Sequence, residues 1–141
     1  MKTSGLLRAN AAFLMVMGGG AAVADAMGHF FGKGPLGAAM FRAPLAISSF
    51  EAHLLAFVMG VLLWRGARLP DRKPFHVLAA VVHVILGGSN ILFFEGAFGA
   101  LGMERFGVFI TAFHVAFACA QASVALKAPR HPTGSVILQE N

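Results

Sequence analysis

The sequence predicts an all-α integral membrane protein: a four-helix bundle with both termini in the cytoplasm. Three observations support this prediction. The 141 residues are 57% hydrophobic and only 12% charged, whereas about a quarter of the residues in a soluble domain are charged. The hydrophobic residues form four long stretches, and Lys and Arg gather in the gaps between them. The chain length allows one transmembrane domain, residues 1–141.

Each apolar stretch is long enough to cross a bilayer, which takes about 20 helical residues. We expect helices over residues 10–31, 45–64, 75–94 and 106–126. The stretches are continuous and lack period-two alternation, which argues against transmembrane β-strands. Short connections with Gly and Pro, such as GKGPLGAAMFRAP and RGARLPDRKP, separate them. A flexible tail is expected over residues 128–141.

The beginning of the chain has a second interpretation. Residues 1–26 combine basic residues, an apolar run and an Ala24-Asp25-Ala26 sequence, a pattern that is also typical of a cleaved signal peptide. Cleavage would leave three helices. We expect the segment to be retained as the first helix.

The distribution of Lys and Arg predicts the orientation of the helices. Basic residues concentrate at the N-terminus, in the middle connection and in the tail: Lys2, Arg8, Arg65, Arg68, Arg72, Lys73, Lys127 and Arg130. These segments should face the cytoplasm, which predicts a multi-pass protein of a bacterial inner membrane. Membrane topology thus explains the net charge of +5, and we expect the lipid bilayer as a partner and no nucleic acid.

Ionisable groups inside the apolar stretches are the candidates for function, because such groups are costly in a bilayer and usually face the bundle interior. The candidate ligand-binding residues are Asp25, Glu51, His53, His83, Asn90 and His114. Their spacing is regular: His76, His83 and Asn90 recur every seven residues, and Thr111, His114 and Gln121 form a second set along one helix. Gly18 shares a side with Asp25, and Ser49 and Gly60 share a side with His53.

The depth of the candidate residues in the membrane is a second regularity. With 1.5 Å of rise per residue, all the candidates except His83 lie roughly 6–12 Å below the outer surface, and His83 lies deeper, near the midplane. This predicts a polar pocket in the outer half of the bundle that binds a small ligand. The alternative is that these groups only hold the helices together through interhelical hydrogen bonds.

Several chemistries suit such a pocket. His53, His83 and His114 are candidate ligands of a transition metal, and His53 with His83 or His114 could ligate haem. Carboxylates among Phe-rich walls could instead hold a lipid-like molecule. A proton path is poorly supported, since only His76 and Gln121 furnish the cytoplasmic half. No nucleophile–base pair is identifiable, so we expect binding rather than catalysis.

The order of the acidic residues resembles a known family. Asp25 late in the first helix, Glu51 in the second and the Val82-His83 to Glu95 run in the third are similar to the EXPERA superfamily of small helical membrane proteins, which includes the sigma-2 receptor and sterol isomerases. The resemblance implies sterol or lipid binding, or isomerase activity, with Asp25 and Glu51 as ligand-pairing acids. The short first connection and His114 depart from that pattern. The chain also resembles small four-helix membrane proteins of bacteria, which implies no chemistry.

Glu51 and His53 raise a separate question. Two residues on a helix are about 200° apart around its axis, so these side chains cannot easily meet at one point. Glu51 must therefore find a neighbouring helix, extend to the surface or face a partner. The small chain could accordingly be an accessory subunit or assembly factor of a larger membrane complex, or form a homo-oligomer.

Overall fold

The computed structural model describes residues 3–44 and 46–127, and this part of the chain is helical without strands. The long helices are α1 (Thr3–Phe31), α3 (Ala46–Gly66), α4 (Lys73–Leu92) and α6 (Glu104–Lys127); α2 (Gly37–Met40), α5 (Phe94–Ala97) and the 3-10 helix η1 (Gly99–Leu101) are short. The all-α prediction is confirmed. All four long helices are long and apolar enough to cross a membrane. The tail expected over 128–141 lies outside the described residues.

Three of the long helices lie within about two residues of their expected bounds, and α1 is the exception. It begins at Thr3, seven residues before the expected start. Leu7, which lies in this added segment, is fully buried in the core. Tertiary packing of Leu7 therefore extends the helix beyond the apolar stretch.

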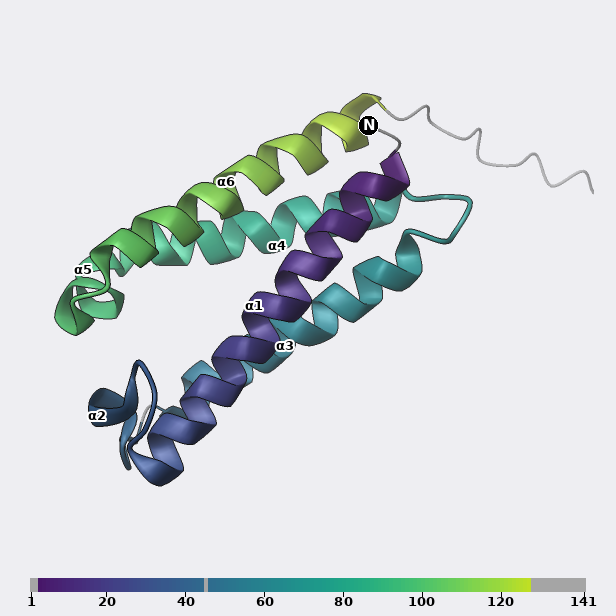
Figure 1. The fold of residues 1–141 in the computed structure, drawn as a ribbon. Helices are drawn as coiled ribbons and strands as arrows, with labels where there is room; N and C mark the ends of the chain where they lie inside the picture. The colour runs from purple at the N-terminus through teal and green to yellow at the C-terminus, as the bar shows by residue number, and fades with distance from the viewer. Residues whose placement is uncertain (1–2, 45, 128–141) are drawn as a thin grey trace, which may run out of the picture.

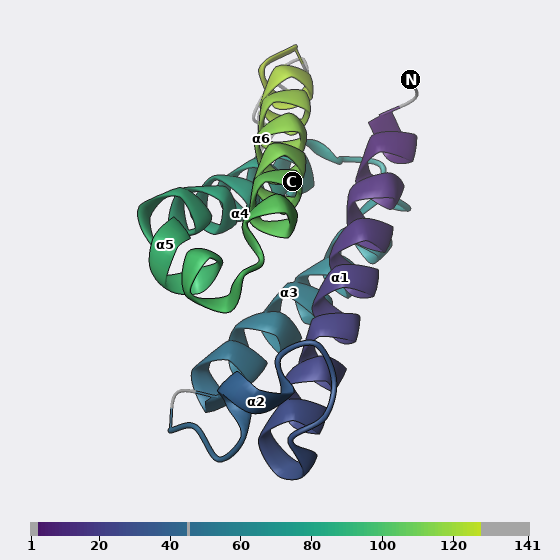
Figure 2. The same cartoon turned by 60° about the vertical axis from the view of Figure 1, so that its left-hand side comes forward.

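The helices form two antiparallel pairs, α1 with α3 and α4 with α6 (Figure 1). The first half of α1 lies against α4 and α6, and from there the two pairs diverge, so that the molecule is shaped like a V (Figures 1 and 2). The beginning of α1 and the end of α6 lie at the joined end of the V (Figure 1). This arrangement separates the far end of the α1–α3 pair from the α4–α6 pair.

The apolar core occupies the joined end. It consists of Leu7, Ala11, Leu14, Leu63, Ala67 and Ala79. These residues come from α1, from α4, and from the end of α3 with the residue that follows it, which explains why the V is closed at this end.

Two glycines allow α1 and α3 to approach closely. A Cβ atom on Gly18 would lie 2.7 Å from the carbonyl oxygen of His53 and 2.8 Å from the amide nitrogen of Phe57. A Cβ atom on Gly60 would lie 2.9 Å from backbone atoms of Ala11 and Met15. Both contacts are with backbone, which has little freedom to move aside. These glycines therefore set the distance between the two helices.

Candidate functional site

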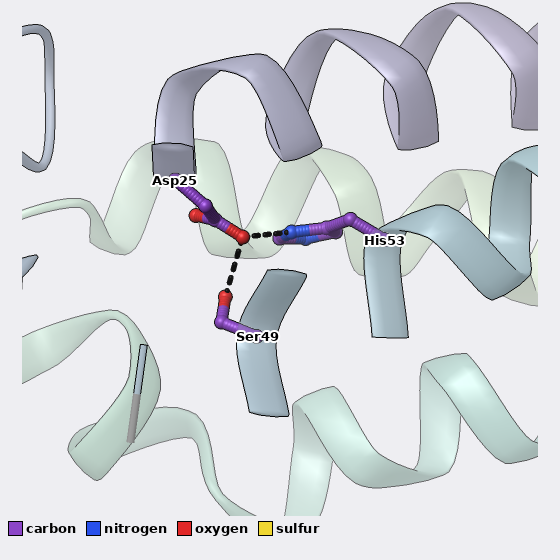
Figure 3. Close-up of polar contacts among 3 residues, drawn as sticks. All are labelled: Asp25, Ser49 and His53. Atoms are coloured by element: carbon purple, nitrogen blue, oxygen red, sulfur yellow. Dashed lines mark hydrogen bonds and ion pairs between the residues drawn. The ribbon is translucent and has the colours of Figure 1, made fainter. Parts of the chain in front are cut away.

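A buried carboxylate joins α1 to α3. Asp25 on α1 is 1% exposed, and its Oδ2 atom accepts a hydrogen bond of 2.9 Å from the Ser49 hydroxyl and one of 2.7 Å from Nδ1 of His53 (Figure 3). Since an ionised carboxylate only accepts, Nδ1 of His53 carries the proton. The three side chains form the Asp25 cluster.

The local sequence explains how the Asp25 cluster forms. Ser49 and His53 are one helical turn apart, so they lie on the same side of α3. Gly18 lies seven residues before Asp25 on α1, and its close contact with the His53 carbonyl brings the two backbones together. The carboxylate and the imidazole are thus held across the seam between α1 and α3.

The Asp25 cluster leaves two atoms without hydrogen bonds. Oδ1 of Asp25 is buried and has no partner among the described residues. The His53 side chain is 37% exposed, and its Nε2 atom makes no hydrogen bond to a described residue. A histidine whose Nδ1–H is held by a carboxylate has a fixed tautomer, with Nε2 available to bind a metal or a ligand.

A second polar cluster lies where α1 meets α4 and α6. Nε2 of His83 donates to Oδ1 of Asn10 at 2.7 Å, and the Nδ1 atoms of His83 and His114 are 2.7 Å apart. Because His83 carries its proton on Nε2, His114 donates from Nδ1 to Nδ1 of His83. Phe117 stacks on His83 with ring centroids 5.1 Å apart, and Phe13 meets His114 edge-on. We call these three polar residues the His83 cluster.

A third polar contact lies in the same seam between α4 and α6. Nδ1 of His76 donates to Oε1 of Gln121, and both side chains are buried. Nε2 of His76 and Nε2 of Gln121 have no partner in the described part of the chain. His76 and His83 on α4 thus face Gln121 and His114 on α6, and these two pairs stabilise the seam.

The six predicted ligand-binding residues are not brought to one place. Asp25 and His53 lie in one cluster, and His83 and His114 lie in another on the other helix pair. Asn90 is half-buried and Glu51 is exposed, and neither hydrogen-bonds to a described residue. The divergence of the two helix pairs explains the separation, because residues at a similar depth on different pairs are held apart.

The predicted metal set is divided in the same way. His83 and His114 are in contact, but His53 belongs to the other helix pair. Within residues 3–44 and 46–127, no group of three or more His, Cys, Asp or Glu side chains is arranged to hold a metal ion. The pairs expected for haem, His53 with His83 or His114, are likewise on different helix pairs.

Asn10 was not among the predicted candidates, although it is fully buried and hydrogen-bonded to His83. An amide at the start of an apolar stretch resembles an interfacial residue. Its partner is 73 positions away along the chain, so only the packing of α1 on α4 reveals the contact.

An apolar groove of about 570 Å³ lies on the α4–α6 pair. It is lined by Ile91, Phe94, Val108, Thr111, Ala112, Val115 and Ala116. None of the six predicted ligand-binding residues lines it. The groove is therefore separate from both polar clusters.

No protein-family model, curated protein or solved structure matches this chain. The resemblance to the EXPERA superfamily thus stays a prediction. Of the two acids it implies, Asp25 is buried between helices and Glu51 is exposed on α3.

Proposed function

We propose that this chain is a multi-pass protein of a bacterial inner membrane that binds a small ligand at His53. Its four long helices have the length and composition of membrane spans. Many large hydrophobic side chains on them are exposed, among them Val16, Leu55, Ile85 and Phe109. Bilayer lipid would cover this surface. The Lys and Arg distribution supports an orientation with the joined end of the V in the cytoplasm, and the shared position of the described chain ends agrees with it (Figure 1).

The observation that carries the ligand proposal is the state of His53. Its Nδ1 is held at 2.7 Å by a carboxylate that is 1% exposed, while its side chain remains 37% exposed. An imidazole needed only for helix packing would be enclosed, as His83 is at 1%. The hydrogen bond at Nδ1 instead orients the His53 ring, and the ring remains accessible near Nε2. This arrangement suits a binding residue.

Two kinds of ligand fit an available imidazole nitrogen. A metal ion or haem iron would bind Nε2 directly. A lipid-like molecule would hydrogen-bond to Nε2 through a hydroxyl or another polar group. Catalysis by a nucleophile is not supported, because the Ser49 hydroxyl donates to Asp25 and no described Ser or Cys hydrogen-bonds to His53.

The test begins with the purified protein in mild detergent. An absorption spectrum detects haem, elemental analysis detects metal, and mass spectrometry detects a bound lipid-like molecule. We expect His53→Ala to abolish the bound species and Asp25→Asn to weaken its affinity about 10–100-fold, as for other groups that orient a ligand. His76→Ala is the matched control, since it removes a histidine from the other helix pair. Full retention in His53→Ala would refute the proposal, as would a wild-type protein without any ligand.

Glu51 favours a second candidate function, that of a subunit in a larger membrane assembly. It is an exposed carboxylate in an apolar helix and has no hydrogen bond or ion pair with a described residue. Such a group is costly in a bilayer unless another polar group pairs with it, and a neighbouring chain would supply that group. The mass of the particle extracted from native membranes in lipid nanodiscs tests this candidate. A monomer of 14.8 kDa would contradict it, and a fixed ratio of other chains would identify a hetero-complex.

A further inference from the structure

We propose that a second copy of this chain completes the His53 site by placing its own Glu51 at Nε2 of His53. The inference rests on the proposed function in two respects: the helices span a membrane, and Nε2 of His53 is the binding atom. It adds the partner and names the residue that the partner contributes.

Helical geometry places the two groups at one level on opposite sides of α3. Two residues correspond to about 3 Å of rise and about 200° of rotation. Glu51 therefore cannot reach His53 of its own copy. It can reach His53 of a neighbour whose α3 lies at the same depth in the membrane.

Each group lacks a partner within one copy. Glu51 makes no polar contact with the described residues, and neither does Nε2 of His53. Glu51 is the sixth residue of α3, which places it about 8 Å from the end of the helix. A carboxylate surrounded by hydrocarbon at that depth is unfavourable. A hydrogen bond to imidazole across an interface would remove this cost.

The side chains around Glu51 suit a contact between helices. Ile47 is 63% exposed, Leu55 is 68% exposed and Val58 is 51% exposed, and all three lie on the Glu51 side of α3. A neighbouring copy would cover these apolar groups together with the carboxylate. At this level the neighbour's His53, whose side chain is 37% exposed, offers an imidazole nitrogen that is complementary to the carboxylate.

The contact joins two different faces of the chain, so it is head-to-tail. Copies related by rotation about the membrane normal keep Glu51 and His53 at the same depth, and such contacts close into a ring. A two-fold axis through the Glu51 face would instead place carboxylate against carboxylate. Copies in opposite orientations are disfavoured by the basic middle connection, which would then face outward.

The completed site limits the chemical classes of ligand that could bind. His53 would lie between the Asp25 carboxylate of its own copy and the Glu51 carboxylate of the neighbour. Because Asp25 holds the Nδ1 proton, the hydrogen bond to Glu51 uses a second proton taken up from water, which Nε2 donates to the carboxylate and which a bound metal cation would displace. A ligand that enters this contact meets an imidazole and a carboxylate. A metal cation or a hydrogen-bond donor fits both groups, whereas an anion is repelled by the carboxylate.

Cross-linking tests the inference without altering the pair. Leu55→Cys and Phe57→Cys lie one turn deeper than the pair, on the same two sides of α3. Cys119→Ala removes the native thiol. In membranes, a short thiol cross-linker should convert the Leu55→Cys/Phe57→Cys chain into a ladder of dimers, trimers and larger species. Either substitution alone should give no ladder. The matched control is Leu55→Cys/Val108→Cys, in which the second cysteine replaces an exposed residue on α6, and it should not give an equal ladder.

The specific contact is tested by adding Glu51→Ala, which cannot hydrogen-bond to Nε2 of His53, to the double-cysteine chain. We expect association to weaken about tenfold, because a charge-assisted hydrogen bond across the interface is lost. The inference is overturned if the double-cysteine chain gives no ladder, if the control gives an equal one, or if Glu51→Ala leaves the ladder unchanged. The two proposals fail separately: loss of ligand in His53→Ala without any ladder would support the ligand site and refute the assembly.

Discussion

Gly18→Ala tests whether the close approach of α1 and α3 builds the Asp25 cluster. The added Cβ atom would lie 2.7 Å from the carbonyl oxygen of His53, and an ordinary contact begins near 3.4 Å. The backbones must therefore separate locally by about 0.7 Å. If that shift is transmitted to the side chains, the 2.7 Å hydrogen bond between Asp25 and His53 lengthens beyond the usual limit of about 3.2 Å.

The expected cost has two parts. Overpacking a close contact costs about 1–3 kcal/mol, and an interhelical hydrogen bond in a membrane protein contributes at most about 1.7 kcal/mol. We therefore expect Gly18→Ala to lower the free energy of unfolding by about 2–4 kcal/mol relative to Gly20→Ala. Gly20 is the matched control, since it lies on the same helix and a Cβ atom there meets nothing within 4 Å.

Unfolding of both variants in detergent, followed by circular dichroism, measures the difference. The nitrogen chemical shifts of the His53 ring report separately on its hydrogen bond to Asp25. The reasoning is refuted if Gly18→Ala is as stable as Gly20→Ala, or if it is destabilised while the His53 signal stays unchanged. The second result would mean that packing and the Asp25 cluster are independent.

Two further substitutions test the other helix pair. His83→Leu removes the partner of Asn10 and of His114, and each buried group left unpaired costs about 1–3 kcal/mol. The double variant His83→Leu/His114→Leu leaves only Asn10 unpaired, so a double-mutant cycle of unfolding in detergent should show a coupling of at least about 0.5 kcal/mol. Strict additivity of the two single changes would contradict the hydrogen bond. Gly107→Ala places a Cβ atom 2.5 Å from the ring of Phe98 and should lower the free energy of unfolding by about 1–3 kcal/mol. Gly88→Ala, with open space around it, should be neutral or stabilising. Equal thermal stability of the two variants would show that the Phe98 ring moves aside freely.

The polar pairs between α4 and α6 show how far spacing alone can predict a structure. His76 and His83 are seven residues apart on one helix, and His114 and Gln121 are seven apart on the next. Each spacing puts its residues on one side of a helix, and antiparallel packing then pairs them. The same argument placed Gly18 with Asp25 and Ser49 with His53. These predictions succeeded because they depend on helical periodicity, a local property.

The prediction of a single pocket in the outer half of the bundle shows the limit of the same method. Depth along the chain placed Asp25, His53, Asn90 and His114 at similar levels, but level does not determine which helices are neighbours. The structure separates the two helix pairs where they diverge, so His53 and His114 belong to different clusters. Angles between helices arise from contacts distant in sequence, which spacing on one helix cannot reveal.

The sequence by itself determined the helical class, the four apolar segments, and the side of each helix that carries its polar groups. These features follow from composition and from the 3.6-residue repeat, and both can be read along the chain. The tertiary structure alone decided that α1 joins both helix pairs, that Asn10 meets His83 across 73 residues, and that Glu51 is left exposed. The physical reason is that these outcomes depend on how helices pack at Gly18, Gly60 and the core around Leu7. Packing is a property of pairs of surfaces, and no single helix carries the information.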